Sequence, residues 1–135
     1  MSQLFIRDIM SPDYPILTPE TELTDAIEQL QKHHLIGAPV VDEARRLVGF
    51  ISEQQLLKPL LDSSYFCDGK NHLSELLATP ALQVSLQTTV VDLATQMQAN
   101  SPKVYPVVAE QKVVGIVTRS QVVAALSKSY LSCAG

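Results

Sequence analysis

Two hydroxyl-x-x-Gln motifs, Ser52 to Gln55 and Thr118 to Gln121, have the clearest potential for binding chemistry in this chain. Each follows a β-branched run and precedes a helical pattern, so each should lie where a strand meets a helix N-terminus. Such a terminus presents unpaired N–H groups and a positive dipole end, which suits an anionic or ribose-like ligand. The same pattern is a capping box, in which the hydroxyl and the Gln bind each other's backbone N–H groups. The local pattern by itself favours capping.

A block of about sixty residues occurs twice in the chain. Pro39 returns as Pro106, a shift of 67 residues, and Gly49 returns as Gly115, a shift of 66. The one-residue difference falls in a polar stretch, where a turn can absorb a deletion. Two stacked copies can build clefts that neither copy has alone, and function is expected in such a cleft.

The periodicity changes in the same order within each copy. Apolar residues spaced i, i+3, i+4 and i+7 predict one helical face starting at Leu23 and another starting at Val90. Thr21 and Thr88 stand two residues ahead of these faces, where a hydroxyl can accept from free helix N–H groups. Two β-branched runs joined by a polar turn then predict a hairpin. A second helix follows, with apolar residues at Leu56, Leu57 and Leu60 in the first copy and Val122, Val123 and Leu126 in the second.

These patterns predict one folding unit of the mixed α/β (α+β) class. A chain of 135 residues can build one good core but not two independent ones, so the copies should share an interface. Each copy should run strand, helix, hairpin, helix. We place the first copy at residues 1–62, a polar linker at 63–71 and the second copy at 72–135.

Charge and hydropathy argue against several classes of function. The net charge is −4, whereas nucleic-acid binding needs clustered Lys and Arg. Residues 1–67 carry ten acidic and five basic side chains, and residues 68–135 carry four and five, so an anion-binding surface should belong mainly to the second copy. The N-terminus has no signal architecture and no apolar run reaches membrane-spanning length, so no membrane association is expected.

Residues that could bind metal or catalyse a reaction lack a suitable context. Cys67 and Cys133 are the only cysteines and have no metal-ligand spacing with His, so free thiols and a cytoplasmic location are expected. His33 and His34 end a predicted helix, where an imidazole can bind terminal carbonyls. The sequence has no Gly-rich phosphate loop and no nucleophile elbow. We therefore expect no catalytic residue and no metal site.

Each copy resembles a cystathionine-β-synthase (CBS) domain, and the pair resembles the tandem arrangement called a Bateman module. The resemblance covers about Phe5 to Leu126 and rests on two ordered sets of motifs at matching spacing. In the first copy they are Asp8-Ile9-Met10-Ser11, Pro19-Glu20-Thr21-Glu22-Leu23, Gly37-Ala38-Pro39-Val40-Val41-Asp42 and Val48-Gly49-Phe50-Ile51-Ser52. In the second copy they are Glu75-Leu76-Leu77-Ala78-Thr79, Pro106-Val107-Val108 and Val114-Gly115-Ile116-Val117-Thr118-Arg119-Ser120.

The resemblance implies a β-α-β-β-α unit used twice about a pseudo-twofold axis, with the two sheets facing each other and two clefts between the copies. In such modules a cleft can bind an adenosine-containing ligand such as AMP, ADP, ATP or S-adenosylmethionine, and no cofactor is obligatory. These modules regulate rather than catalyse, and two of them commonly associate into a homodimer. The regulated target would be a separate protein.

The resemblance also implies which residues would form each cleft. The first cleft would combine the first copy's strand region with the second copy's helix start, that is Ser11, Ile36, Gly37, Ala38, Thr118, Arg119 and Gln121. The second cleft would use Thr79, Lys103, Val104, Tyr105, Ser52 and Gln55. Gly37 would let the backbone approach a flat base edge. Tyr105 could stack on a base or pack in an interface.

The chain departs from the family at the last residue of the motif. The family pattern ends in Asp, whose carboxylate accepts from both ribose hydroxyls, whereas this chain has Gln55 and Gln121. A Gln has one carbonyl acceptor beside an amide donor, which weakens acceptance from a ribose diol. Arg119 and Lys103 favour an anion site near the second copy, whereas Glu53 occupies the place of Arg119 in the first copy. If one cleft is occupied, we predict the cleft with Thr118 and Arg119.

Two functions from different classes follow from these patterns. In the first, an adenine nucleotide or S-adenosylmethionine enters the cleft and shifts the module between two arrangements that a partner distinguishes. In the second, the Gln residues are simply caps, the cleft is filled by side chains, and the chain is a ligand-free dimerisation or interaction module.

Overall fold

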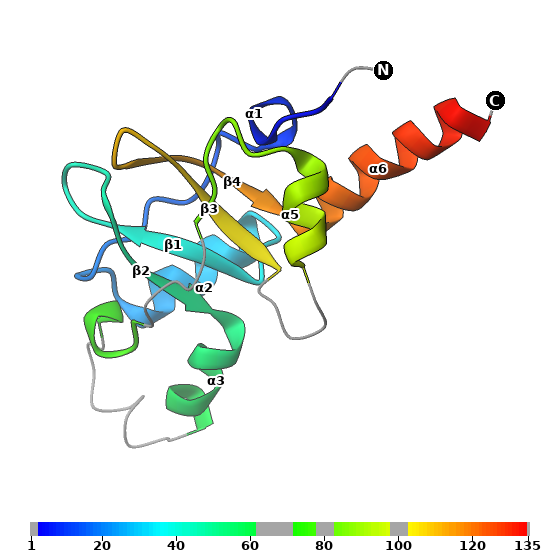
Figure 1. The fold of residues 1–135 in the computed structure, drawn as a ribbon. Coiled ribbons are helices and arrows are strands. Elements are labelled where there is room, and N and C mark those ends of the chain that lie inside the picture. The colour runs from blue at the N-terminus through cyan, green and yellow to red at the C-terminus, as the bar shows by residue number, and fades with distance from the viewer. Residues whose placement is uncertain (1–2, 62–71, 78–82, 98–102, 135) are drawn as a thin grey trace.

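The computed structural model describes residues 3–61, 72–77, 83–97 and 103–134, and it shows helices packed around two small antiparallel sheets (Figure 1). The predicted linker at 63–71 lies outside the described residues. The first half contains α1 (Ile6–Ile9), α2 (Leu23–Lys32), β1 (Gly37–Val41), β2 (Leu47–Ser52) and α3 (Glu53–Leu61). The second half contains the 3₁₀ turn η1 (Leu73–Glu75), α5 (Val90–Gln96), β3 (Val104–Ala109), β4 (Lys112–Thr118) and α6 (Arg119–Ala134).

Both predicted hairpins are confirmed, with the same pairing in each half. Val41 pairs with Leu47 across the first turn, and Val108 pairs with Val113 across the second. The first turn holds one residue more than the second between these pairs, so the shift between the repeats does change from 67 to 66 in the turn. A register irregularity follows at the same place in both hairpins, between Val40 and Val41 and between Val107 and Val108.

The apolar helical faces are confirmed, but the predicted N-caps are wrong. α2 buries Leu23, Ala26 and Leu30, and α5 buries Val90 and Leu93. Thr21 does not cap α2: its Oγ1 accepts from the N–H of Thr18, 2.9 Å away, and so closes the turn before the helix. Thr88 does the same with Ser85.

The residue that caps α5 is Thr89, whose Oγ1 accepts from the N–H of Asp92 at 3.0 Å. The cap of α2 is Glu22, and its side chain makes no capping hydrogen bond. The helices therefore start one residue later than a cap at Thr21 or Thr88 would require.

The leading strand of each repeat is reduced to a single bridge. Leu17 makes a parallel bridge to Val40, and Val84 makes the equivalent bridge to Val107. Pro15 and Pro19 flank Leu17 in the sequence and have no N–H to donate, so a longer ladder cannot form there. Each sheet has two strands.

Each repeat places a segment from its own start in the core of the other repeat. We call residues 4–11 and 73–77 the crossing segments. Ile6 is fully buried among second-repeat side chains such as Leu93 and Tyr105. Leu73 is fully buried among first-repeat side chains such as Leu17 and Leu30. The two cores are therefore completed reciprocally, which makes the repeats one folding unit.

Two glycines make room for the crossing segments. A Cβ at Gly115 would lie 2.6 Å from the carbonyl oxygen of Ser11, and one at Gly49 would lie 3.1 Å from the Leu77 side chain. The backbone of Ser11 also pairs with Ile116, with N–H to O distances of 2.8 and 2.9 Å. The repeated glycine of the sequence therefore marks where the other repeat's chain crosses the hairpin.

A third apolar cluster joins the facing sheets. We call it the central cluster; its buried members are Tyr14, Val41, Val104, Val113 and Ile116. The hydroxyl of Tyr14 donates to the carbonyl of Val113 at 2.7 Å, so this buried polar group has a partner. The sheets thus pack through apolar side chains, and open space between the repeats is left at the edges of this cluster.

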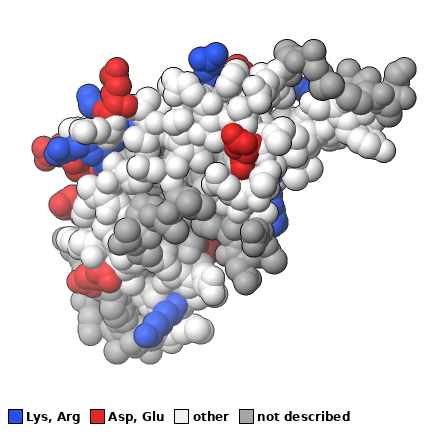
Figure 2. All heavy atoms as spheres, in the orientation of Figure 1, with Lys and Arg blue, Asp and Glu red and all other residues white. Residues whose placement is uncertain are grey.

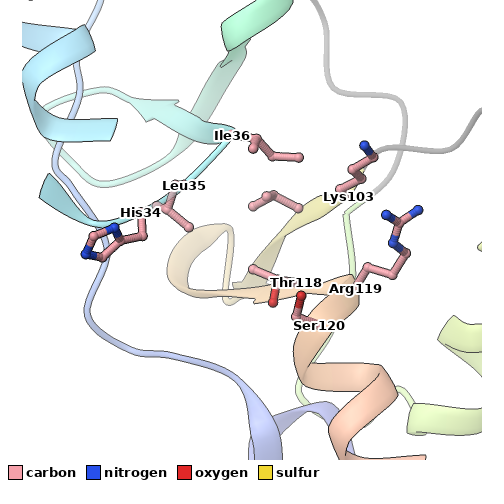
Figure 3. Close-up of a pocket in the computed structure, with 8 residues that line it drawn as sticks. His34, Leu35, Ile36, Lys103, Thr118, Arg119 and Ser120 are labelled. Carbon is pink, nitrogen blue, oxygen red and sulfur yellow. The ribbon is translucent and has the colours of Figure 1, made fainter. Parts of the chain in front are cut away.

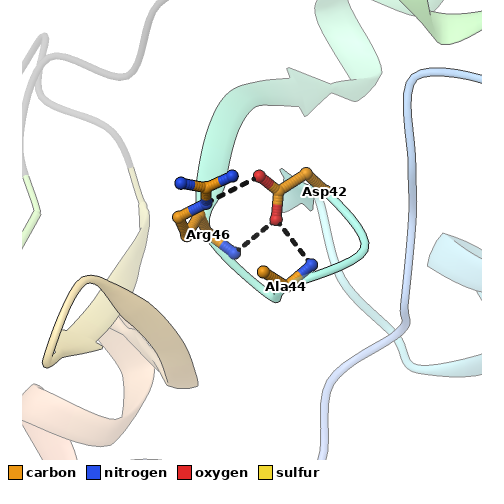
Figure 4. A network of polar contacts seen from close by, with 3 residues as sticks. All are labelled: Asp42, Ala44 and Arg46. Carbon is orange, nitrogen blue, oxygen red and sulfur yellow. Dashed lines mark hydrogen bonds and ion pairs between the residues drawn. The ribbon is translucent and has the colours of Figure 1, made fainter.

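Charged side chains gather at the left edge of the molecule in Figure 2, where Figure 1 places the hairpin turns. In the β1–β2 turn, Oδ1 of Asp42 accepts from the N–H groups of Ala44 and Arg46, each 2.9 Å away (Figure 4). Its Oδ2 pairs with Arg46 Nε at 2.9 Å. The backbone N–H of Arg46 is the main cause that lowers the pKa of Asp42 below its ordinary 3.8, helped by the Arg46 side chain and the N–H of Ala44.

Among the described residues, no helix combines the length and the apolar character that crossing a lipid bilayer requires.

Adding one methyl group should destabilise the protein more at Gly115 than at the equivalent Gly49. Gly115→Ala should lower the free energy of unfolding by about 1–3 kcal/mol, because the Ser11 backbone cannot move without losing its pairing with Ile116. Gly49→Ala should cost less than about 1 kcal/mol, because its Cβ would lie 3.1 Å from Leu77 and needs a shift of only a few tenths of an ångström. Urea denaturation of both variants measures the difference. Equal losses would show that the crossing of residues 4–11 is not a tight contact.

The hydrogen bonds of Asp42 predict that the stability of the fold decreases in acid. The pKa of Asp42 is lower in the folded protein than in the unfolded chain, so the contribution of Asp42 to stability is complete when the pH is above the unfolded-state pKa. That contribution is lost as the pH falls through the folded-state pKa. Wild type should therefore lose stability more steeply than Asp42→Asn below about pH 4, measured by urea denaturation between pH 7 and 3. Glu43→Gln removes the same charge from the same turn and should follow wild type. Parallel curves for wild type and Asp42→Asn would contradict the assignment.

Candidate functional site

A pocket of about 230 Å³ lies between the two repeats, at the edge of the central cluster. The first repeat contributes the segment between α2 and β1, and the second contributes the start of β3 and the junction of β4 with α6 (Figure 3). Its lining residues are His34, Leu35, Ile36, Lys103, Val104, Thr118, Arg119 and Ser120.

The charge in this pocket is positive. Lys103 and Arg119 lie on one side of it, and His34 lies on the opposite side (Figure 3). Among the described residues that line it there is no Asp or Glu. Within the part of the chain that the structure describes, neither Lys103 nor Arg119 forms an ion pair. Two cations without a partner, close to hydroxyl groups, can bind an anion such as a phosphate.

Backbone hydrogen bonds hold the pocket walls in place. The N–H of Arg119 donates to the carbonyl of Lys103 at 2.9 Å, which ties the start of α6 to the start of β3. The equivalent bond in the first repeat runs from the N–H of Glu53 to the carbonyl of Ile36, also 2.9 Å. The backbones at the two helix starts are therefore alike, while the side chains are not: Arg119 stands where the other repeat has Glu53.

The predicted capping box is complete in the second repeat. Thr118 Oγ1 accepts from the N–H of Gln121 at 3.2 Å, and Gln121 Oε1 accepts from the N–H of Thr118 at 2.8 Å.

In the first repeat only half of the box forms. Gln55 Oε1 accepts from the N–H of Ser52 at 2.9 Å, but the Ser52 hydroxyl donates to Oε1 at 3.2 Å instead of accepting from backbone. Gln55 Nε2 also donates to the carbonyl of Leu76 at 3.0 Å, which ties α3 to a crossing segment. An Asp at this place would have no donor for that bond.

Capping does not use all the donors at the start of α6. Thr118 Oγ1 acts as an acceptor in the box, so its own proton remains available to a ligand. The N–H groups of Arg119 and Gln121 have acceptors, whereas no described residue accepts from the N–H of Ser120. The junction can therefore cap its helix and still offer an O–H and an N–H to an anion.

Three of the residues predicted for the first cleft line the pocket together, namely Ile36, Thr118 and Arg119. Gln121 is engaged in the capping box, and the Ser11 hydroxyl donates to the carbonyl of Asp13 at 3.0 Å. Ala38 is fully buried in the core of the first repeat. A Cβ at Gly37 would lie 2.9 Å from Phe50 Cε2, so the space that this glycine leaves is bordered by the Phe50 ring.

The structure divides the residues predicted for the second cleft. Lys103 and Val104 line the same pocket as Thr118 and Arg119. Ser52 and Gln55 bind each other at the start of α3. Tyr105 is fully buried in the core of the second repeat, and none of the described residues accepts from its hydroxyl. Thr79 lies outside the described residues.

The sequence interpretation missed three lining residues, His34, Leu35 and Ser120. His33 was correctly expected to bind a helix-terminal carbonyl: its Nδ1 lies 3.0 Å from the carbonyl oxygen of Gln29. His34 is in the left-handed region with a φ of 55°, and this bend turns the chain toward the pocket. Ser120 could have been found as a second hydroxyl in the motif after Thr118. Among the described residues, no group of three or more His, Cys, Asp or Glu side chains could hold a metal ion.

Residues 6–62 and 73–128 each match the family model of the CBS domain. The chain belongs to the CBS domain family. Among solved structures, this CBS pair is similar to CBSX2 of Arabidopsis thaliana in complex with AMP, with a TM-score of 0.79 and 28% identity over 94% of this chain and 98% of that one. It is also similar to the CBS domain pair of protein MJ0100 in complex with 5′-methylthioadenosine and S-adenosyl-L-methionine, with a TM-score of 0.77 and 25% identity over 95% and 99%.

The chain spans about half the length of the curated relatives that it matches. One of them is the uncharacterised protein MJ1225 of Methanocaldococcus jannaschii, 25% identical over 125 residues, which are 93% of this chain and 44% of that protein. The matches confirm the predicted fold, two CBS repeats in a mixed α+β chain. They also show that CBS pairs of this fold bind adenosine-containing ligands in related proteins.

The capping box at the pocket predicts a specific loss of stability. Thr118→Ala should lower the free energy of unfolding by about 0.5–2 kcal/mol, because the N–H of Gln121 loses its acceptor. Thr118→Ser keeps the oxygen and should stay within about 0.5 kcal/mol of wild type. Chemical denaturation of the three proteins measures this. A Ser variant as unstable as the Ala variant would show that the methyl group of Thr118, and not its hydroxyl, stabilises the junction.

Proposed function

We propose that this CBS pair is a regulatory module that binds an adenosine-containing ligand, AMP, ADP, ATP or S-adenosylmethionine, in the pocket between its repeats. Binding would change how a separate protein recognises the module, because a ligand shifts an equilibrium between two arrangements by its different affinity for them. The pocket supports this: it joins residues of both repeats, so a bound ligand contacts both. A cytoplasmic location remains a prediction from the two cysteines.

The observation that carries the proposal is the position of two cations, Lys103 and Arg119, beside the start of α6 and between the repeats. Lys103 and Arg119 have no ion-pair partner among the described residues, and Thr118 and Ser120 offer donors beside them. CBSX2 with AMP and the MJ0100 pair with its two adenosyl ligands have the same fold. Glu53 in place of Arg119 at the other helix start favours one anion site per chain.

A ligand-free interaction module is the second candidate, and the engaged Gln residues favour it. Gln55 and Gln121 both use their carbonyl oxygens to bind the backbone at their own helix starts. Under this alternative the Gln residues serve only as caps, and the module acts through its protein contacts alone.

Both candidates are compatible with a homodimer, which we propose from exposed apolar side chains on α3 and α6. Leu57 and Leu60 are 57% and 43% exposed, and their repeat equivalents Val123 and Leu126 are 59% and 37% exposed. Two equivalent apolar surfaces about a pseudo-twofold axis suit a symmetric contact with a second copy. α6 continues past the body of the molecule, with Tyr130 73% exposed (Figure 1).

Ligand binding is tested by isothermal titration of AMP, ADP and ATP into wild type and Arg119→Ala. Removing the guanidinium should weaken binding by about tenfold or more, because hydrogen bonds to charged groups are among the stronger ones. Glu53→Ala alters the equivalent position of the other repeat and should bind at least as tightly as wild type, because it removes a negative charge and no cation. If neither wild type nor Glu53→Ala binds, and no adenosyl compound raises the melting temperature, the ligand-free candidate is left.

The homodimer is tested by native mass spectrometry of protein purified without added nucleotide. Wild type should be dimeric at micromolar concentration, and the double variant Leu57→Glu, Val123→Glu should be monomeric, because dimerisation would bury four unpaired carboxylates. Val91→Glu places the same charge on an equally exposed residue of α5 and should leave the dimer intact. A monomeric wild type, or a dimeric double variant, would remove this part of the proposal.

A further inference from the structure

The pocket's charge and the engaged state of Gln121 together restrict the class of ligand. We infer that this site selects its ligand by phosphate groups and is indifferent to the ribose 2′-hydroxyl, so that it takes nucleoside phosphates and rejects S-adenosylmethionine and unphosphorylated adenosine. This inference rests on the proposed function, since it specifies which adenosine compounds the proposed pocket accepts.

Selection for phosphate follows from the charge of the lining. Among the described lining residues, Lys103 and Arg119 are the only Lys, Arg, Asp or Glu, and neither is neutralised by a described partner. Glu53 lies next to the pocket, its N–H bound to the carbonyl of Ile36, but its side chain is not part of the lining. A sulfonium beside these two cations would be repelled, whereas each phosphate oxygen gains charge-assisted hydrogen bonds.

Indifference to the ribose follows from the hydrogen bonding of Gln121. Its one carbonyl oxygen already accepts from the N–H of Thr118 at 2.8 Å. A carboxylate could bind this N–H with one oxygen and accept from both ribose hydroxyls in charge-assisted bonds, whereas the amide has one neutral lone pair left and an NH₂ group that only donates. With no Asp or Glu in the lining, the described pocket offers no charged acceptor for a ribose diol.

The pocket's size agrees with recognition of the phosphate end. Its volume of about 230 Å³ lies below the range of about 300–1,000 Å³ that is typical of sites for drug-sized ligands. The phosphate end fits in this volume, beside Lys103 and Arg119. The uncharged end of the ligand would lie over Ile36, which is 41% exposed at the first-repeat side of the pocket.

Four ligands distinguish the two parts of this inference by isothermal titration: ADP, 2′-deoxy-ADP, adenosine and S-adenosylmethionine. ADP and 2′-deoxy-ADP should have Kd values within about threefold of each other, and the other two should bind at least about tenfold more weakly. S-adenosylmethionine or adenosine binding as tightly as ADP would overturn the phosphate selection and leave the proposed function standing. 2′-Deoxy-ADP binding about tenfold more weakly than ADP would overturn the indifference to ribose. Binding by none of the four would remove the proposed function itself.

Two variants and one control, Glu53→Ala, keep the test sharp. Lys103→Ala with Arg119→Ala should abolish the preference for ADP over adenosine, while Glu53→Ala should keep it. Gln121→Asp supplies the missing carboxylate and should make the site prefer ADP to 2′-deoxy-ADP by about tenfold. If Gln121→Asp leaves the two Kd values equal although it folds and binds ADP, Gln121 is not the residue that sets the response to the ribose.

Discussion

The reciprocal exchange of short segments between the repeats is the constraint on which the rest of the structure depends. Ile6 fills the second repeat and Leu73 fills the first, and both are fully buried. Gly115 and Gly49 lie where these segments cross the hairpins. Because each core contains a part of the other repeat, the relative position of the two hairpins is fixed. The pocket between them is therefore a property of the pair, and neither repeat could form it alone.

The same backbone at the two helix starts carries different chemistry. The bonds from Arg119 to Lys103 and from Glu53 to Ile36 are equivalent in partners and in length. The side chains at these four positions give a cationic pair in one repeat and an acid beside an apolar residue in the other. A symmetric scaffold thus supports an asymmetric site, because side chains can change while the hydrogen bonds that hold the fold are kept.

The sequence was sufficient to predict what depends on local periodicity. The hairpins, the buried faces of α2 and α5, and the capping box at Thr118 were all predicted from spacing, because these features depend on neighbours a few residues apart. The N-cap at Thr88 was wrong because Thr88 and Thr89 satisfy the local rule equally well. The N-cap at Thr21 was wrong because its hydroxyl closes the turn with Thr18 instead, and α2 begins after Glu22. Tertiary contacts also decided which predicted residues share a pocket. Lys103 joins Thr118 because β3 pairs with β4 in one hairpin, and His34 joins them through a left-handed bend that the sequence did not indicate.

The crossing segments also have a consequence for the order in which the protein can fold. During synthesis the first repeat's hairpin and helices emerge before Leu73, so its core lacks a fully buried side chain until the chain has grown past that residue. The second repeat needs Ile6, which emerges at the very beginning and must wait for a binding surface that is made last. Neither half can complete itself as an intermediate, so the transition to the native state should be a single cooperative step that joins the two ends of the chain.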